Sequence, residues 1–323
     1  MKKLYFIFFL LLAMFTCKPL FAVGDAPDTV KAGIYITSIH DIDFKQREYN
    51  MSAWLWLKYK NPDFDFIKNL EVPLAKSVNK SFTTTDTAED GEIYILMKLD
   101  CTMKDSWKVD NFPFDAQKLR FSIENSQFDS KALVFVVDTL GKHFDPKYTL
   151  RGWDIDSISL KAGTKSYETT FGDRELTKPH VEYSNFRMML QIERDAVGLF
   201  WKMFLGMYVA FLIAFMCFFI NVNSFDSRFS LSVGSLFAVV GNKYIVDSSL
   251  PESSTFTLVD ALHGTTLMFI LGIIICNTIS VYYVRHEKLA RAKHLDRIIG
   301  PIFFVVYAII NIYLIKNAIY AGQ

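Results

Sequence analysis

The sequence predicts an antiparallel β-sandwich followed by a bundle of four membrane-spanning helices. Three observations support this fold class. No apolar run of membrane length occurs between residues 30 and 194, and four long apolar segments follow this region. The third is composition: 51% of the 323 residues are hydrophobic and 21% are charged. This composition is too apolar for an ordinary soluble protein and too polar for a membrane bundle alone. A protein with both a soluble domain and a membrane domain is therefore expected.

The amino-terminal residues predict a signal peptide over residues 1–22. Lys2 and Lys3 precede the apolar run Leu4–Phe15, and small residues follow at Ala22 and Gly24. Cleavage near Ala22 exports the remainder of the chain. An uncleaved anchor is the alternative, although the apolar run is short for a membrane span.

Residues 23–195 are predicted to form the exported β domain. Segments rich in Ile, Val, Tyr, Phe and Trp alternate with Gly, Asp, Asn and Pro, which is typical of strands and turns. The expected strands are Gly33–Ile39, Tyr49–Tyr59, Glu92–Leu99, Leu119–Ile123, Leu133–Val137, Trp153–Leu160 and Tyr183–Ile192. Asp90-Gly91 indicates a hairpin turn. Cys101 is the only cysteine in this region, so no disulfide is expected within it.

Residues 196–323 are predicted to form the membrane domain. Its expected helices are Leu199–Val222, Asp226–Ser248, Leu258–Tyr283 and Ile298–Ile315. The link from Arg285 to Arg297 carries five basic and two acidic residues, whereas the link after the second helix has no Lys or Arg. The positive-inside rule therefore puts the basic link in the cytoplasm. The β domain and the carboxyl terminus are then both outside, as the signal peptide also predicts.

The second membrane helix is unusually polar for a lipid-exposed helix. Arg228, Asn242 and Lys243 lie within it, and such side chains are costly against lipid. On a helical period, one stripe combines small or polar residues with two aromatic residues and begins at a carboxylate. The stripe consists of Asp226, Ser230, Gly234, Phe237, Gly241, Tyr244 and Ser248. We therefore expect this helix to line a pore.

Four short motifs resemble those of one membrane-protein family. Phe112-Pro113-Phe114-Asp115-Ala116-Gln117 is similar to the FPFDxQ signature of the pentameric ligand-gated ion channels, which include the Cys-loop receptors. Gly152-Trp153-Asp154-Ile155, Arg194 and the Leu250-Pro251 step occur in the same order as in that family. The resemblance covers nearly the whole mature chain.

Three departures from the family pattern accompany this resemblance. The positions that match the family's cysteine pair are Asp105 and Leu119, which resembles the prokaryotic branch. The first membrane helix lacks the family's usual proline. The Trp-x-Pro segment expected between Phe64 and Asp90 is absent, which leaves the outline of the ligand pocket open.

The resemblance implies that a coupling region joins the two domains. Asp115 and Arg194 are expected to form a bidentate ion pair at the membrane surface. Pro113 and Phe114 on the FPFD loop are expected to meet the turn at Pro251. Asp43 is a weaker candidate partner for Arg194, because Asp41 is an equal candidate by spacing.

The resemblance also assigns roles along the proposed pore helix. Five copies of Asp226 imply a carboxylate ring that attracts cations, with Ser230 offering a hydroxyl to hydrated ions. Capping of the helix amino end is the alternative role for Asp226. Phe237 and Tyr244 are the candidate gate residues, and packing against neighbouring helices is their alternative. Gly234 and Gly241 either widen the lumen or permit close helix packing.

A ligand site is implied between adjacent subunits, under the hairpin Tyr167–Pro179. Its candidate aromatic residues are Trp54, Phe128, Tyr167 and Phe171, which together suit an ammonium group. Protons are the alternative signal. His263 is the histidine whose protonation within a membrane span has the largest consequence, although ordinary buried hydrogen bonding is its commoner role.

The resulting functional expectation is a homopentameric channel of a bacterial inner membrane. It passes cations, contacts membrane lipid and is opened by an extracellular small molecule or by protons. A non-conducting sensor on the same scaffold is the alternative. An enzyme is disfavoured, since no nucleophile motif, phosphate loop or metal-ligand spacing occurs, and no cofactor or metal is expected. The net charge of +1 argues against nucleic-acid binding.

Overall fold

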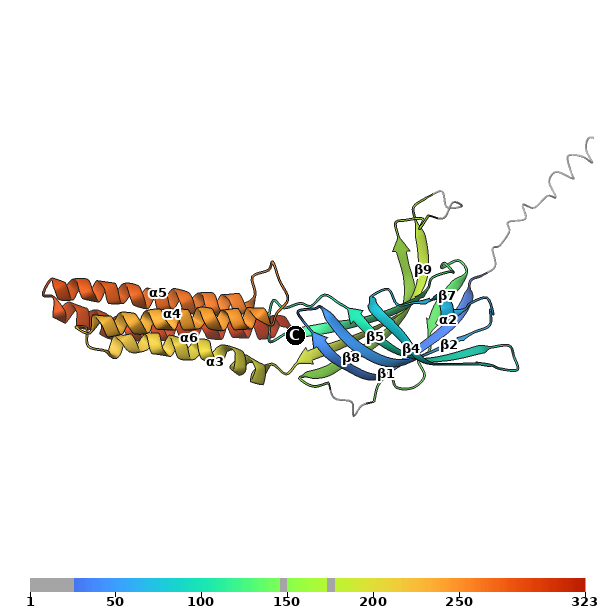
Figure 1. Ribbon diagram of the computed structural model, residues 1–323, viewed down its shortest axis with the longest axis horizontal. Coiled ribbons are helices and arrows are strands. Elements are labelled where there is room, and N and C mark those ends of the chain that lie inside the picture. The colour runs from blue at the N-terminus through green and yellow to red at the C-terminus, as the bar shows by residue number, and fades with distance from the viewer. Residues whose placement is uncertain (1–25, 146–149, 173–177, 323) are drawn as a thin grey trace, which may run out of the picture.

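The computed structural model describes residues 26–145, 150–172 and 178–322. The predicted signal peptide therefore lies outside the described residues. Figure 1 shows an elongated molecule in which a β domain and a helical bundle lie end to end. The chain passes between them once, where the last strand ends at Arg194 and the first long helix begins at Ala196.

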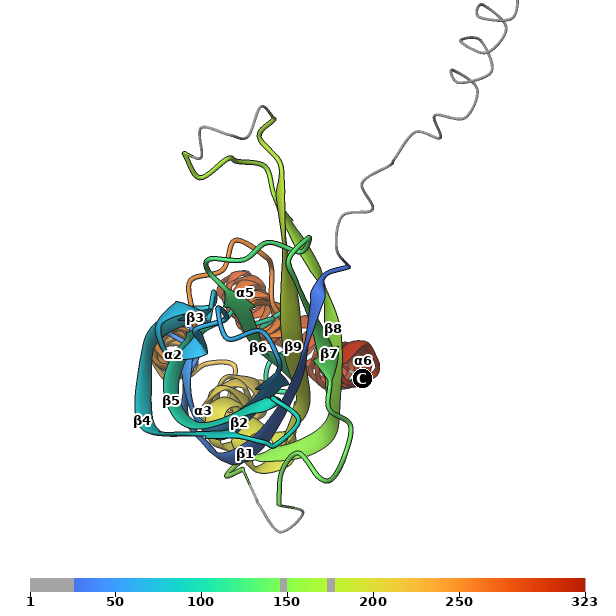
Figure 2. The same ribbon diagram turned by 90° about the vertical axis from the view of Figure 1, so that its right-hand side faces the viewer.

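Two sheets form the β domain, as the sequence predicts. One has the strand order β4-β5-β2-β1-β7 and the other β3-β6-β9-β8. The strands are β1 Asp28–Asp43, β2 Glu48–Tyr59, β3 Leu70–Glu71, β4 Ala75–Thr87, β5 Ile93–Lys104, β6 Ala116–Asn125, β7 Leu133–Val137, β8 Trp153–Tyr167 and β9 Val181–Arg194, with the short helix α2 at Phe66–Asn69. Figure 2 shows this domain from its far end.

One strand pair departs from the predicted antiparallel arrangement. β1 and β7 pair in parallel, with Asp28 opposite Leu133 and Ala32 opposite Val137. Strand β4 was absent from the sequence prediction. Its residues include polar Lys, Ser, Asn and Thr. Most of them are exposed to solvent, because β4 lies at the edge of the sheet. The predicted turn at Asp90-Gly91 joins β4 to β5, and Gly91 has a φ of +82° there.

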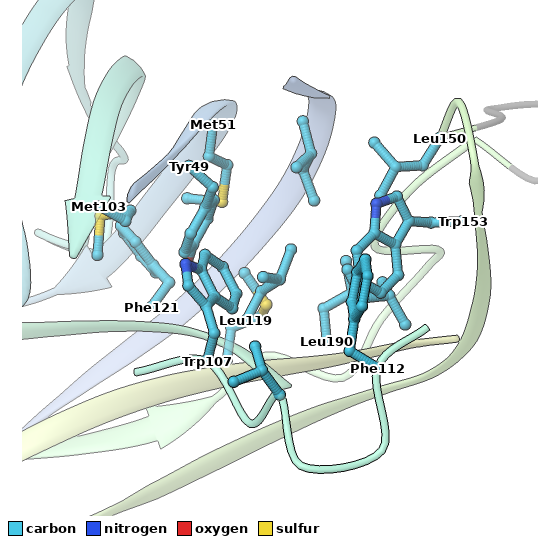
Figure 3. Close-up of a cluster of buried hydrophobic side chains, with 14 of the residues drawn as sticks. Tyr49, Met51, Met103, Trp107, Phe112, Leu119, Phe121, Leu150, Trp153 and Leu190 are labelled. Carbon is cyan, nitrogen blue, oxygen red and sulfur yellow. The ribbon is translucent and has the colours of Figure 1, made fainter. Parts of the chain in front are cut away.

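The core of the sandwich follows from alternation along the strands. Every second residue of β2 is buried, from Tyr49 to Tyr59. Figure 3 shows a part of the core in which Tyr49 faces Trp107 and Phe112 lies beside Trp153. Phe44 stacks on Trp107 and Trp153, at ring-centroid distances of 5.1 and 5.9 Å. This aromatic group stabilises the base of the β domain, where the chain enters the bundle.

The indole of Trp56 links three strands across the outer face of the larger sheet. It extends over Gly33 on β1 and donates a hydrogen bond to Asp138, just after β7, at 3.0 Å. A Cβ atom at Gly33 would lie 2.3 Å from the Trp56 ring, so this close approach requires glycine. Trp54 is also half-buried on the outer face, and neither tryptophan belongs to the inner core.

Within the described part of the chain, four helices are long and apolar enough to cross a membrane. They are α3 Ala196–Phe215 with the 3₁₀ turn η1 Met216–Phe219, α4 Phe225–Ser248, α5 Leu258–Arg285 and α6 Leu289–Gly322. α3 packs on α4, α4 on α5 and α5 on α6. Seen along the long axis, α6 stands at one edge of the bundle (Figure 2).

Two helix boundaries differ from the sequence prediction. The regular part of the first helix ends at Phe215 and not at Val222. The predicted basic link is mostly helical, because α6 begins at Leu289 and already contains Arg291, Lys293 and Arg297. Hydropathy detects only the part of a helix that crosses lipid, whereas Ala, Leu, Lys and Arg favour helix beyond it.

Candidate functional site

Arg194 and Asp115 form a bidentate ion pair where the two domains meet. Arg194 donates from Nε to Asp115 Oδ1 at 2.7 Å and from Nη2 to Oδ2 at 3.2 Å. Their side chains are 10% and 3% exposed, so both charges are largely removed from water. Gln117 Nε2 also donates to Asp115 Oδ2, at 2.6 Å. Two charge-assisted bonds in this setting fix the last residue of β9 to the FPFD loop.

Three aromatic rings surround the guanidinium of Arg194. Its central carbon lies 4.0 Å from the ring centroid of Trp153, 4.6 Å from Phe44 and 4.9 Å from Phe112. Cation–π attraction strengthens when the cation is desolvated, as here. The Arg194 side chain is therefore held from four sides, by one carboxylate and three rings.

Asp43 does not pair with Arg194. Its Oδ1 accepts a hydrogen bond from the backbone N–H of Gln46 at 2.8 Å, and its carbonyl accepts one from Trp107. Asp41 instead bonds to His40 and Asn50. The loop after β1 reaches Arg194 through Phe44, the residue after Asp43, because this aromatic ring suits the apolar side of the pocket.

Three hydrogen bonds between the domains are made by residues other than the predicted prolines. Asp110 accepts from the backbone N–H of Leu258 at 2.8 Å and from Thr255 Oγ1 at 2.6 Å. Arg47 Nη2 donates to the carbonyl of Glu252 at 3.0 Å. Asp110 and Arg47 are not identifiable from sequence, since two of these three bonds are accepted by backbone carbonyl groups, which every residue has.

Phe114 connects the FPFD loop to the first membrane helix. Its ring lies 5.5 Å from that of Phe200 on α3. Pro113 on this loop and Pro251 in the α4–α5 turn are both buried. The FPFD loop therefore touches α3 through Phe114 and the α4–α5 turn through Asp110.

The predicted stripe on α4 is uncovered along its whole length. All seven of its residues are exposed, with Phe237 67% and Tyr244 76% exposed. A Cβ atom at Gly234 or Gly241 would meet no atom within 4 Å, so neither glycine serves close packing within the chain. Ser224, and not Asp226, is the N-cap of α4. Asp226 lies in the first turn, where the helix dipole favours a carboxylate.

The opposite face of α4 is buried, mainly against α3 and α5. Its buried residues are Arg228, Ser232, Ser235, Val239 and Val246. Near the outer end, Asn242 donates from Nδ2 to the carbonyl of Met203 on α3 at 3.1 Å. Its Oδ1 lies 3.0 Å from His263 Nε2 on α5, and His263 Nδ1 lies 2.8 Å from the carbonyl of Val259. A polar chain thus links α5, α4 and α3.

The candidate ligand residues form three separate groups within one chain. Tyr167 and Phe171 pack edge to face at 5.3 Å, Phe128 packs on Phe64 at 4.8 Å, and Trp54 packs on Phe82 at 5.6 Å. The first group lies on the hairpin after β8, in which residues 173–177 are outside the described part.

The face of the Tyr167 ring already has a cation of its own chain. Lys165 Nζ lies 4.5 Å from the ring centroid, and the Tyr167 hydroxyl donates to buried Glu124 at 2.8 Å. Burial and the Glu124 carboxylate raise the pKa of Tyr167 well above its usual value. The Tyr167 hydroxyl therefore stays neutral and donates a hydrogen bond.

No group of three or more His, Cys, Asp or Glu side chains suited to a metal ion occurs among the described residues. In the acidic turn after β4, Asp90 pairs with Lys60 at 3.1 Å. Cys101 is a free, buried thiol.

β-Sandwich-like sheets followed by four helices long enough to cross a membrane are consistent with the fold of the pentameric ligand-gated ion channels. No protein-family model matches the chain. The chain is 25% identical over 313 residues to a protein described as a proton-gated ion channel, from Gloeobacter violaceus. The match covers 90% of this chain and 84% of the relative. The chain is a homologue of that channel, and its resemblance to the pentameric ligand-gated ion channels is confirmed.

Proposed function

We propose that five copies of this chain form a cation channel that α4 lines and protons open. The observation that carries this proposal is the α4 stripe, whose seven residues are all exposed in the single chain. A ring of identical helices gives such a stripe a water-filled lumen to face. In this ring Asp226 forms the cytoplasmic mouth, and its carboxylates concentrate cations.

The narrow part of the proposed pore is formed by Phe237 and Tyr244. Both side chains are exposed in the single chain, so both are free to converge at the centre of a ring. Apolar constrictions of this kind close a pore by excluding water. Gly234 and Gly241 leave the lumen wide on either side of Phe237. The β domain then lies outside a bacterial inner membrane, with the carboxyl terminus on the same side.

Proton gating is supported by the relative's activity and by the hydrogen-bond chain at His263. This hydrogen-bond chain ends at two carbonyl groups, those of Val259 and Met203, which can accept but not donate hydrogen bonds. Its three links need three N–H donors in suitable directions. Neutral imidazole has one N–H, and the Asn242 amide satisfies one further link while its oxygen accepts in the other. Two links are satisfied when His263 is neutral and all three when it is protonated.

Two carboxylates and one ammonium group lie near His263. Lys243 on α4 bonds to Asp247 on α4 and to Asp260 on α5, each at 2.7 Å. On α3, the side chain in ring contact is Phe204, which is uncharged. Protonation of His263 completes the hydrogen-bond chain from α5 through Asn242 on α4 to α3. The completed chain draws the outer half of α4 away from the lumen. A charge-assisted bond contributes about 1.5–3 kcal/mol per subunit.

The test is to record current from purified protein in liposomes while the outside pH is lowered from about 7.5 to about 4.5, a range that spans ordinary histidine titration. We expect current to rise with acid in the native protein and to lose this dependence in His263→Gln. His286→Gln is the matched control, because His286 makes the same i−4 carbonyl bond but is exposed at the end of α5.

Each outcome has a distinct meaning. Acid-evoked current that survives unchanged in His263→Gln refutes the histidine as the proton site. The absence of current from the native protein at every pH refutes the channel and favours a non-conducting sensor.

A further inference from the structure

A buried ion pair joins the cytoplasmic end of α4 to α6. Arg228 lies on the face of α4 opposite the stripe, and its side chain is 1% exposed. Its Nη2 donates to Asp296 Oδ2 on α6 at 2.5 Å, and its Nε donates to the carbonyl of Cys217 on η1 at 2.8 Å. Asp296 is 8% exposed and also accepts from Ser280 on α5 at 3.2 Å. All four membrane helices contribute to this cluster.

The position of Arg228 creates an electrostatic problem for the proposed pore. It lies two residues from Asp226, so five subunits bring five positive charges close to the proposed ring of carboxylates. A charge in a low-dielectric environment acts over a long range, since little water screens it. Left uncompensated, these charges oppose the attraction of Asp226 for cations.

Asp296 removes this opposition in two ways. Its carboxylate cancels the charge of Arg228 within the helix bundle, and its short bond holds the guanidinium against η1 and α6, away from the stripe. We propose that Asp296, on the outermost helix and remote from the lumen, determines ion selectivity by neutralising Arg228. Asp296 is thus a positioning residue that acts through Arg228, and this inference rests on the proposed cation channel.

The neighbouring cations on α6 strengthen the assignment of this role to Asp296. Lys293 and Arg297 line a cavity of about 620 Å³ together with Asp296, Phe218 and Pro301. Neither Lys293 nor Arg297 forms an ion pair with any of the described residues. Asp296 bonds to Arg228, the buried arginine of α4. Two cations of its own helix are close in sequence, Lys293 three residues before it and Arg297 one residue after it.

The test is the reversal potential in a gradient of sodium chloride, measured in liposomes at an activating pH. We expect Asp296→Asn to lower the sodium-to-chloride permeability ratio severalfold. Glu287→Gln is the matched control, because it removes one negative charge from the exposed α5–α6 link without touching Arg228. It is expected to leave the ratio unchanged. Elution of each variant at the native oligomer size checks assembly.

The double variant Arg228→Gln/Asp296→Asn keeps the test decisive if the single variant does not assemble. Because the pair is neutral before and after this change, the native permeability ratio is expected. A double variant more cation-selective than the native protein shows that Arg228 was never compensated, and overturns the inference. An unchanged ratio in Asp296→Asn also overturns it. A native protein without any current refutes the proposed function instead.

Discussion

Loss of the Arg194 guanidinium is expected to weaken both the fold and the connection between the domains. In Arg194→Gln, the carboxylate of Asp115 keeps only the bond from Gln117 and stays buried at 3% exposure. Breaking a buried pair by removing one partner costs about 3–5 kcal/mol. Part of this cost is the lost contact with Trp153, whose ring centroid lies 4.0 Å from the guanidinium carbon.

Urea unfolding of the full chain in detergent, followed by tryptophan fluorescence, measures this cost. Asp115→Asn and the double variant Asp115→Asn/Arg194→Gln complete a double-mutant cycle. The double variant is expected to cost less than the sum of the single variants, because it leaves no unpaired buried charge. A sum that is additive within about 0.5 kcal/mol refutes a coupled pair.

The connection between the domains is tested by a second measurement, the proton concentration that half-activates the proposed channel. Arg120→Gln is the matched control for it. Arg120 also bonds to a buried aspartate, Asp105, but lies away from the aromatic rings around Arg194. Both arginine variants lower stability, whereas only Arg194→Gln is expected to shift the half-activating pH. Equal shifts in the two variants would show that Arg194 acts through stability alone.

Four further outcomes are expected. Phe237→Ala opens the proposed constriction and raises current at neutral pH, and no increase in this leak would remove Phe237 from the gate. Gly33→Ala brings a Cβ to 2.3 Å from Trp56 and costs about 1–3 kcal/mol in urea unfolding by overpacking; a neutral effect would contradict the close approach. Burial favours a higher pKa for Asp138, but the hydrogen bonds it accepts outweigh this and hold its pKa below the usual 3.8. The stability from Asp138 is thus present above pH 3.8 and lost as the pH falls below it, so Asp138→Asn destabilises the protein at neutral pH and not in strong acid. Burial raises the pKa of Cys101 to about 12, so a maleimide at pH 8 is expected to label this thiol only after urea unfolding.

Local pattern was enough to predict most of the strands and the four long helices. The aromatic residues of Tyr49–Tyr59, set between turn residues, predicted a strand, and the structure has β2 at Glu48–Tyr59. The polar stripe on α4 was also predictable, because helical period alone decides which residues share a face. The exposure of all seven residues in the single chain is consistent with that period. Edge strand β4 escaped prediction, since its polar residues carry no alternation of burial.

The sequence by itself determined the order of the domains, the membrane spans and the stripe on α4, because each depends on residues close together in the chain. Only the tertiary structure decided which distant residues meet. Arg194 is surrounded by Phe44, Phe112 and Trp153, and Arg228 bonds to Asp296 across 68 positions of sequence. The physical reason is that a desolvated charge needs partners from every side, and only packing of separate elements brings them together.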